Sequence, residues 1–572
     1  MKTRGFLLNI LLFSRLHGVI ASEGQLAEVT FGGTRVTGRR NTELNIDFFG
    51  GVPFAEPPLK DLRFLPPVLK TTLNSSEFDA SKPGLACLQT PSPPDGITED
   101  CLTLNIYRPA TTNNNKTLPV LFWIHGGGWV VGSGGRYNGS RLASRSIARG
   151  TPVVIITVNY RLGALGFPLG EESAADGILN LGLRDVVAAL QWVKANIGAF
   201  GGDPAKVTIF GESAGAKDIS LLLYNDQIND LASGAILESD AGMALMDPPL
   251  TSDIWSGFVS AVAPCSHLSS TTNTLDCLRS ENVSSGDLVR AYEIANITFG
   301  GSLSFAWAPI LDGDGGLVPG YTSQSVIKAN FPVIVGSNLD EGTLIVSQDP
   351  TNTSSDDNIR VLIRSIFHPP SGREEDFQHI MDRVLKAYPN VPALGSPFGT
   401  GNETFGLSPD YKRAAAVLGD ALSQANRRLL LEQLAQRTET QVYSFIFADT
   451  NEGVLTVPPE FNLGTPAPGS LGATHSAEIS YVFGTLEDEL GSNAVAKSAL
   501  ELSQTVMDYW ISFAVTGDPN DGRGAQRPRW TPFNPGNPMV IQLKGNDTRM
   551  ISDTFREEGI SVFNEDPTVF RR

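Results

Sequence analysis

The chain has 572 residues, 41% of them hydrophobic, and a formal net charge of −18 at pH 7. Its length leaves room for several domains, although large α/β enzymes often enlarge a single core by insertion. The acidic balance disfavours nucleic acid and anionic membrane surfaces as partners, because phosphate groups attract Lys and Arg.

The N-terminal segment has the features of a secretory signal peptide. Lys2 and Arg4 make its start basic, and a short apolar stretch then leads to small residues that end at Ala21. We therefore predict a signal peptide at residues 1–21 and a secreted, extracellular protein whose mature part, residues 22–572, is a single domain. No other window approaches the ~18 apolar residues of a membrane span.

Eight N-x-S/T sequons are spread along the chain. One sequon alone is uninformative, but this many behind a signal segment are typical of a eukaryotic secreted glycoprotein. The predicted glycosylation sites are Asn74, Asn115, Asn138, Asn282, Asn296, Asn352, Asn402 and Asn546.

Four cysteines, Cys87, Cys101, Cys265 and Cys277, lie in two close pairs along the sequence. In a secreted protein an even number of cysteines suggests disulfides, and four cysteines allow three pairings. The simplest pairing joins Cys87 to Cys101 and Cys265 to Cys277. A metal site is the rival interpretation, but no C-x-x-C spacing or nearby histidine cluster supports it, so we predict no metal.

The first part of the chain predicts a series of strands. Residues 28–36 and 44–49 alternate enough to be antiparallel strands at a sheet edge, and residues 99–109 also show a period of two. Residues 118–124 are largely apolar, which is expected of a central strand that is buried on both faces.

A run of three glycines follows that apolar strand, in His125-Gly126-Gly127-Gly128-Trp129. Such glycines leave backbone N–H groups accessible and let a ligand approach them closely, which is what an oxyanion hole requires. A tight turn is the alternative, but it would not need three glycines in a row. His125 abuts the strand end, so we expect it to pack and to shape the loop.

A second glycine-rich motif lies between a predicted strand and a predicted helix. Residues 153–159 predict a buried strand, residues 180–197 a helix, and residues 207–210 another short strand. Gly211-Glu212-Ser213-Ala214-Gly215 then fits the G-x-S-x-G nucleophile elbow, and residues 216–224 can form the helix that follows. A plain glycine-rich loop with a serine is the alternative, and the flanking strand and helix disfavour it.

Three stretches of the sequence carry a family resemblance. Residues 99–109 read EDCLTLNIYRP, residues 125–129 read HGGGW and residues 200–215 read FGGDPAKVTIFGESAG. Together they resemble the signatures of type-B carboxylesterases and lipases, the cholinesterase-like α/β-hydrolases, and we expect a fungal secreted member. The resemblance runs from about residue 25 to about residue 535. It implies an α/β-hydrolase fold with a mixed, mostly parallel central sheet and helices on both faces.

A serine nucleophile needs a histidine base that a carboxylate orients, in the chain order Ser, acid, His. Among the six histidines, elimination leaves His475, and the family's G-x-x-H-x-x-E pattern falls on the same residue. For the acid, a predicted strand at residues 331–335 leads to a loop that carries Asp340 and Glu341. The residues alone leave both acids open, and the family's DEG motif implies Glu341.

The resemblance implies a serine carboxylic ester hydrolase that acts through an acyl-enzyme. Ser213 would attack the ester, His475 would move the proton and Glu341 would orient the imidazole. The oxyanion hole would consist of the backbone N–H groups of Gly127, Gly128 and Ala214. Such an enzyme needs no metal or organic cofactor. Its expected partners are a small-molecule ester and water, with no nucleic acid, no transmembrane segment and no obligate protein partner.

The loop between Cys87 and Cys101 bears on the substrate. In the cholinesterases of the family this loop carries a tryptophan for a quaternary ammonium group, and in interfacial lipases it is a long amphipathic lid. Here it reads LQTPSPPDGITED, which is short, Pro-rich and without an aromatic residue. We therefore expect an esterase for soluble or small acyl esters, with an interfacial lipase as the alternative. Trp129, Trp255 and Phe305 either line an acyl pocket or pack in the core.

A non-catalytic binding protein is a further alternative, because the family includes adhesion proteins that keep the fold and lose the nucleophile. Retention of Ser213, Glu341, His475 and the three glycines argues against it.

Overall fold

The computed structural model describes most of the chain from residue 25 onward. The described residues are 25–110, 116–239, 241–299, 306–346, 348, 355–437, 440–450, 466–491 and 494–572. The predicted signal peptide at residues 1–21, the sequons at Asn115 and Asn352, and Phe305 lie outside them.

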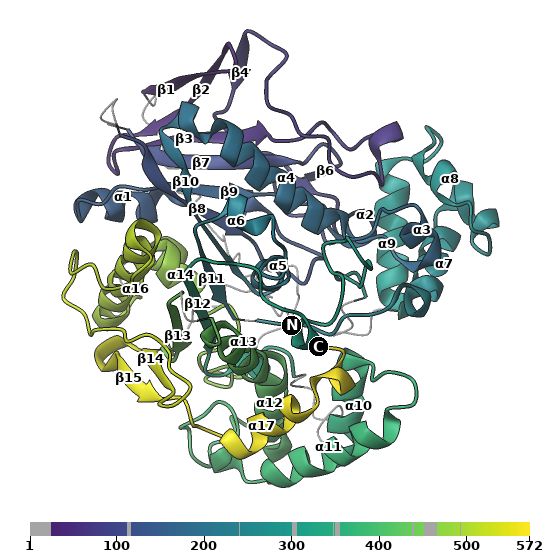
Figure 1. Cartoon of the computed structure of the whole chain (residues 1–572), viewed down its shortest axis with the longest axis vertical. Helices are drawn as coiled ribbons and strands as arrows, with labels where there is room; N and C mark the ends of the chain where they lie inside the picture. Colours follow the sequence, from purple (N-terminus) through teal and green to yellow (C-terminus); the bar gives the residue numbers. More distant parts are fainter. Residues whose placement is uncertain are drawn as a thin grey trace, which may run out of the picture.

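One large sheet runs through the centre of the molecule (Figure 1). Its strand order is β1-β2-β3-β7-β9-β8-β10-β11-β12-β13-β14-β15, with β4 paired to β2. From β9 to β14 in this order all neighbours are parallel. The pairs nearer each edge, β1–β2, β2–β3, β3–β7, β7–β9 and β14–β15, are antiparallel. The predicted mixed, mostly parallel sheet of an α/β-hydrolase is therefore confirmed.

The strands have the following bounds: β1 Leu26–Phe31, β2 Thr34–Asn41, β3 Ile46–Pro53, β4 Glu77–Asp79, β5 Ala86–Cys87, β6 Ile97–Thr98, β7 Thr103–Pro109, β8 Leu118–Ile124, β9 Val154–Val158, β10 Gly202–Glu212, β11 Gly234–Glu238, β12 Val333–Asn338, β13 Val442–Phe447, β14 Met539–Leu543 and β15 Arg549–Ser552. The strands β5 and β6 form a separate small sheet.

The helices have the following bounds: α1 Ser140–Ala148, α2 Gly163–Gly166, α3 Gly170–Ala175, α4 Leu181–Asn196, α5 Ala214–Leu222, α6 Ile228–Leu231, α7 Ser252–Ala261, α8 Leu275–Arg279, α9 Ser285–Phe299, α10 Asp356–Phe367, α11 Glu374–Ala387, α12 Pro409–Gly419, α13 Ala425–Ala435, α14 Ile479–Phe483, α15 Leu486–Leu490, α16 Lys497–Thr516 and α17 Glu557–Glu565.

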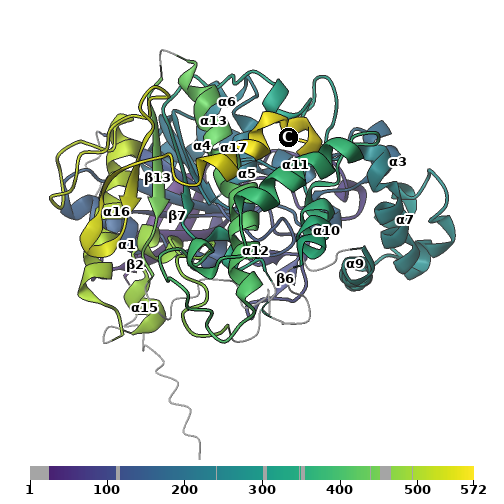
Figure 2. The same cartoon turned by 90° about the horizontal axis from the view of Figure 1, so that it is seen from below.

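Helices cover both faces of the sheet, as the side chains of β8 illustrate. Val120, Phe122 and Ile124 pack into the apolar cluster that includes α4 and α5, whereas Leu121 and Trp123 pack into the cluster that includes α1 and α16. Successive side chains of a strand point to opposite faces, so a strand covered on both sides has a continuous apolar sequence. Figure 2 shows α4, α5 and α13 on one side of the sheet and α1 and α16 on the other.

Two helical groups pack beside this layered core. The helices α10, α11, α12 and α17 share one apolar cluster, and α7 and α9 share another (Figure 1). A single domain over residues 22–572 stays a prediction.

The prediction of one strand over residues 28–36 is wrong, because the structure has two strands there. β1 ends at Phe31 and β2 begins at Thr34, and the two pair as an antiparallel hairpin. Gly32 and Gly33 form the turn with φ angles of 56° and 88°, a left-handed conformation that costs glycine little. β-branched residues continue on both sides of the turn, which hides it in the sequence pattern.

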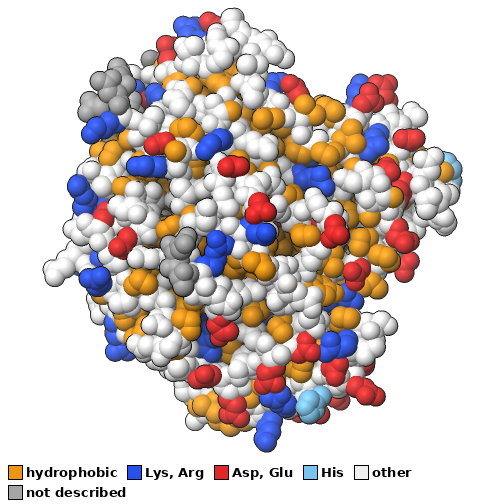
Figure 3. Space-filling view, in the orientation of Figure 1, with side chains coloured by type: hydrophobic (Ala, Val, Ile, Leu, Met, Phe, Trp, Pro, Cys, Tyr) orange, Lys and Arg blue, Asp and Glu red, His pale blue; other side chains and the backbone are white. Residues whose placement is uncertain are grey.

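Charged side chains of both signs are interspersed on the face in Figure 3, with hydrophobic side chains between them. That face therefore carries no continuous basic stripe of the kind that binds nucleic acid. Among the described helices, none has the combination of length and apolarity that crossing a bilayer requires.

Candidate active site

Ser213 occupies a sharp corner between β10 and α5. β10 ends at Glu212, α5 begins at Ala214, and Ser213 between them has φ 55° and ψ −121°, a conformation that is strained for any residue except glycine. A Cβ atom on Gly211 would lie 2.7 Å from the carbonyl oxygen of Ile124, and one on Gly215 would lie 2.0 Å from it. The flanking glycines are therefore required for the elbow to pass so close to β8.

His475 links Ser213 to Glu341. Its Nε2 lies 2.9 Å from Ser213 Oγ, and its Nδ1 lies 2.6 Å from Glu341 Oε2. The other carboxylate oxygen, Glu341 Oε1, accepts a hydrogen bond of 2.6 Å from the N–H of Asn338 at the end of β12. A histidine with one ring nitrogen on a hydroxyl and the other on a fixed carboxylate can move a proton to and from that hydroxyl.

The other acid that the sequence left open, Asp340, is used elsewhere. Its Oδ1 accepts hydrogen bonds of 2.8 Å from Ser396 Oγ and from the N–H of Phe398. Its Oδ2 accepts from the N–H of Ala473 at 2.9 Å, two residues before His475. Asp340 therefore fastens the histidine loop, and it makes no contact with the imidazole in this arrangement.

The glycine loop after β8 leaves the N–H groups of Gly127 and Gly128 without a backbone acceptor in the part of the chain that the structure describes. Gly127 and Gly128 have φ angles of 108° and 61°. Within the described residues, the N–H groups of Gly127, Gly128 and Ala214 donate to no backbone carbonyl, whereas those of Val130 and Val131 donate to Gly127 O. These three N–H groups, from the loop and from the start of α5, are thus available to a ligand.

His125 is a packed residue of this loop. It is fully buried, its ring stacks on Tyr160 with 4.4 Å between the ring centres, and its Nδ1 lies 2.8 Å from Gly126 O. Burial lowers the pKa of His125 to about 4, so the ring is neutral at physiological pH. It shapes the loop, as the sequence suggests.

Three buried glutamates near His475 escaped the sequence analysis. Glu212 Oε1 lies 3.3 Å from His475 Nε2. Glu478 accepts hydrogen bonds from Ser239 Oγ at 2.8 Å and from the side chain of Asn338 at 2.6 Å. Glu238 is fully buried and accepts from an indole N–H. Two of these had a signal in the sequence, because Glu212 is part of G-x-S-x-G and Glu478 completes G-x-x-H-x-x-E.

These carboxylates set the charge of the imidazole. Burial lowers the pKa of His475, but the charges of Glu212 and Glu341 outweigh burial and raise its pKa above the ordinary value of 6.5. Burial raises the pKa of Glu478 to about 8 and also raises the pKa of Glu238, and in both cases the charges of neighbouring glutamates add to the effect. The site therefore favours the imidazolium that forms when the histidine takes a proton.

The tryptophans that were candidates for an acyl pocket pack in the interior. Trp129 is fully buried, and Trp255 is 4% exposed and packs edge-on against Phe64. Their side-chain N–H groups donate to Asp218 Oδ1 and Thr274 Oγ1. Core packing, the alternative to a place in an acyl pocket, therefore accounts for both tryptophans.

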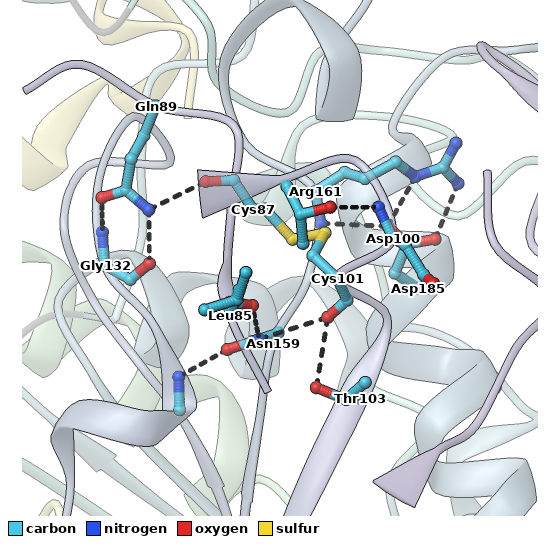
Figure 4. The surroundings of a disulfide bond; sticks show 12 residues. Leu85, Cys87, Gln89, Asp100, Cys101, Thr103, Gly132, Asn159, Arg161 and Asp185 are labelled. Atoms are coloured by element: carbon cyan, nitrogen blue, oxygen red, sulfur yellow. Dashed lines mark hydrogen bonds and ion pairs between the residues drawn. A yellow bond between two sulfur atoms is a disulfide. The ribbon is translucent and has the colours of Figure 1, made fainter. Parts of the chain in front are cut away.

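The Cys87–Cys101 disulfide closes a loop that is tied to Gly132 and Asn159 (Figure 4). The Gln89 amide donates to Gly132 O and accepts from Gly132 N, both at 2.9 Å. Asn159 donates to the carbonyl of Cys101 at 3.2 Å. The loop is thus fixed near both of its ends.

The two large aliphatic residues of this loop face the protein. Leu88 is 6% exposed and Ile97 is half-buried, and both pack in the cluster that contains α7 and α9. They also line an open groove of about 450 Å³ together with Val289 of α9. The second disulfide, Cys265–Cys277, lies in the same cluster.

The described sequons differ in accessibility. Five asparagines are exposed, namely Asn74, Asn138, Asn282, Asn402 and Asn546. Asn296 is half-buried and its Oδ1 accepts from Trp307 Nε1 at 2.8 Å, so it is the least suited to carry a glycan.

In the part of the chain that the structure describes, no group of three or more His, Cys, Asp or Glu side chains is placed to hold a metal ion.

Comparison with known proteins places the chain in a family. The model of the Carboxylesterase family matches residues 25–561. The chain belongs to this family. It is 32% identical to Lipase 2 of Geotrichum candidum, over 92% of this chain and 93% of that protein. It is 31% identical to the secreted triacylglycerol lipase LIP1 of Gibberella zeae, over 94% of this chain and 90% of that protein.

A solved structure agrees with this assignment. Aspergillus niger EstA superposes with a TM-score of 0.77 at 26% identity, and the match covers 96% of this chain and 99% of EstA. The predicted family, fold and enzyme class are thereby confirmed: the protein is a carboxylic ester hydrolase with the α/β-hydrolase fold.

Proposed function

We propose that this carboxylesterase is a secreted serine hydrolase that acts through an acyl-enzyme, with Ser213, His475 and Glu341 as its triad. The observation that carries the proposal is the continuous hydrogen-bonded chain from Ser213 Oγ through His475 to Glu341, with distances of 2.9 and 2.6 Å. The left-handed corner at Ser213 supports it, because strain of this kind collects at functional sites.

The reaction follows from these contacts. Ser213 Oγ attacks the ester carbonyl while His475 Nε2 takes its proton, and Glu341 stabilises the resulting imidazolium. Nε2 then gives the proton to the leaving alcohol, which leaves an acyl-serine. Water attacks the acyl-serine in the same way and releases the acid. The N–H groups of Gly127, Gly128 and Ala214 hold the oxyanion in both steps, and one such donor is worth about 3 kcal/mol of barrier.

Secretion rests on the chain's own features and on its relatives. The sequence begins with a signal-like segment over residues 1–21, and two disulfides fit an oxidising compartment. The similar protein of Gibberella zeae is a secreted lipase.

The substrate we favour is a soluble or short-chain ester. A lipase lid hides a large apolar mouth, whereas the Cys87–Cys101 loop has only two large aliphatic residues, of which Leu88 is buried and Ile97 half-buried. A lipase is the second candidate, since relatives such as Lipase 2 of Geotrichum candidum carry that name.

Partitioning between water and methanol tests the acyl-enzyme. Acetate esters with different leaving groups (p-nitrophenyl, phenyl and ethyl) are hydrolysed in the presence of methanol, and methyl acetate and acetic acid are measured. A common acetyl-enzyme gives one product ratio for all three esters. A ratio that changes with the leaving group means that water attacks the ester directly, and the proposal would fail.

A further inference from the structure

The residue after the two oxyanion glycines has an unusual backbone. Trp129 has φ 61°, directly after Gly128 with the same angle and Gly127 with 108°. The left-handed region is unfavourable for a bulky side chain, and such a conformation persists only where the surroundings hold it. The contacts of Trp129 therefore determine whether the glycine loop keeps its shape.

Trp129 is held through both its side chain and its backbone. Its indole N–H donates to Asp218 Oδ1 at 2.9 Å, and its carbonyl accepts from the N–H of Gly163 at 2.8 Å. The ring is fully buried, and the Lys217 ammonium lies 5.6 Å from its centre. The side-chain half of this support comes from α5, the helix that begins directly after Ser213.

Asp218 is an unusual residue for the interior of that helix. Its side chain is fully buried, and its Oδ2 has no hydrogen-bond partner among the described residues. Burial raises its pKa to about 8, against the opposing influence of the Trp129 hydrogen bond and of Lys217. A buried carboxyl with one incompletely bonded oxygen is unfavourable for folding, so stability gives no reason for it.

The position of this hydrogen bond supplies a reason. The proposed oxyanion hole has two parts, the N–H groups of Gly127 and Gly128 on the loop and that of Ala214 on α5. The Trp129–Asp218 bond joins the residue after the first part to the fifth residue after Ser213. It is therefore a direct side-chain link between the two parts.

We propose that Asp218 is a positioning residue, which acts through Trp129 to fix Gly127 and Gly128 at the correct distance from Ala214. The inference rests on the proposed serine mechanism and adds to it a residue that touches neither the substrate nor the triad. An oxyanion hole works only if its donors are preorganised, so a loosened loop lowers transition-state binding more than substrate binding.

Three variants separate this role from mere packing. Asp218→Leu puts a larger, apolar side chain in place of the carboxyl and removes the acceptor. Trp129→Phe keeps an aromatic ring and removes the donor, and Asp218→Asn keeps the size and a neutral acceptor. For each variant, active sites are counted by titration with an organophosphonate, and kcat and KM are expressed per active site. Inhibition by a trifluoromethyl ketone, whose serine adduct places an oxyanion in the hole, is measured in parallel.

The proposal predicts a specific pattern. Asp218→Leu and Trp129→Phe lower kcat by about tenfold or more and leave KM within about twofold. They raise the inhibition constant of the ketone by about the same factor as they lower kcat. Asp218→Asn stays within about threefold of the wild type. The double variant Trp129→Phe/Asp218→Leu is no slower than the slower single variant, because both changes remove one bond.

Other outcomes overturn it. If Asp218→Leu and Trp129→Phe lower only the fraction of titratable sites or the melting temperature, with normal kcat per site, Asp218 serves folding alone. If Asp218→Leu does not fold, Trp129→Phe with normal kcat and normal ketone binding rejects the proposal by itself. Failure of the serine mechanism is distinguishable, because the wild type would then resist both the organophosphonate and the ketone.

Discussion

Glu341 Oε2 accepts a hydrogen bond from His475 Nδ1 at 2.6 Å, whereas its chain neighbour Asp340 accepts from the N–H of Ala473 at 2.9 Å. Two adjacent carboxylates thus reach the same histidine loop from different directions. Glu341 contacts the imidazole, and Asp340 contacts the backbone that carries it. The two residues should therefore respond differently to the same conservative change.

Replacement of each acid by its amide tests this division. Glu341→Gln should lower kcat by roughly 10³–10⁴-fold with the fold intact, because the imidazolium loses its counter-charge. Asp340→Asn should keep kcat within about tenfold but lose about 1–3 kcal/mol of stability, since an amide nitrogen would face a backbone donor. The measurements are kcat per titrated site and urea unfolding. The reverse pattern would assign the catalytic acid to Asp340.

Glu212 should control the acid limb of the pH profile. Its carboxylate lies 3.3 Å from His475 Nε2 and helps to raise the pKa of that histidine. Glu212→Gln removes a negative charge that stabilises the imidazolium, so the pKa falls and the acid limb of kcat/KM moves to lower pH. Glu478→Gln is the matched control, because the charge of Glu478 also raises the pKa of His475 but by less than that of Glu212, so this variant should move the acid limb less. An acid limb that stays at the same pH in Glu212→Gln, or that moves to higher pH, would contradict this electrostatic account.

Both disulfides should stabilise the fold. Cys87–Cys101 and Cys265–Cys277 span 14 and 12 residues of sequence, and loops of this size are worth about 3 kcal/mol each in the chain-entropy model. Replacing either pair by serines should lower the unfolding free energy by that amount. Peptide mapping without reductant should recover the same two pairs from the secreted protein, and cross-paired peptides or free thiols would refute the pairing.

The rate should show no interfacial activation. Leu88 is buried, Ile97 is half-buried, and the Gln89 amide binds the backbone of Gly132, so this loop is tied down and exposes too little apolar surface to act as a lid. Rate against tributyrin concentration should follow a hyperbola through the solubility limit, as it should for triacetin, which stays dissolved. A sharp rise when the tributyrin emulsion forms would show that another segment acts as a lid, and the enzyme would be a lipase.

Much of the fold could be predicted because buried strands have a simple pattern. β8 lies over the predicted residues 118–124 and β9 within the predicted 153–159, since strands covered on both faces are continuously apolar. The edge hairpin at Gly32 and Gly33 was missed, because the apolar pattern continues across the two-residue turn; the Gly-Gly pair itself was the available signal. Pattern analysis was weakest at this edge of the sheet.

The site was predictable in its motifs and less so in its surroundings. Ser213 and His475 follow from spacing and elimination, but the choice of Glu341 over Asp340 needed the family resemblance, because both acids follow the same strand. Glu478 lies in the G-x-x-H-x-x-E pattern, but neither its role nor that of Asp218 was predicted, since whether an acidic side chain is buried depends on tertiary packing. For Asp218, the available signal was the presence of two adjacent charged residues, Lys217 and Asp218, in an otherwise apolar helix.

The most direct test of the central claim is labelling of the nucleophile. A fluorophosphonate that reacts with activated serines should label Ser213 in one-to-one ratio with loss of activity, because Ser213 is the hydroxyl 2.9 Å from His475 Nε2. Ser213→Ala should fold with an unchanged melting temperature, take up no label and lose nearly all turnover. Labelling of a different serine, together with full activity in Ser213→Ala, would contradict the account.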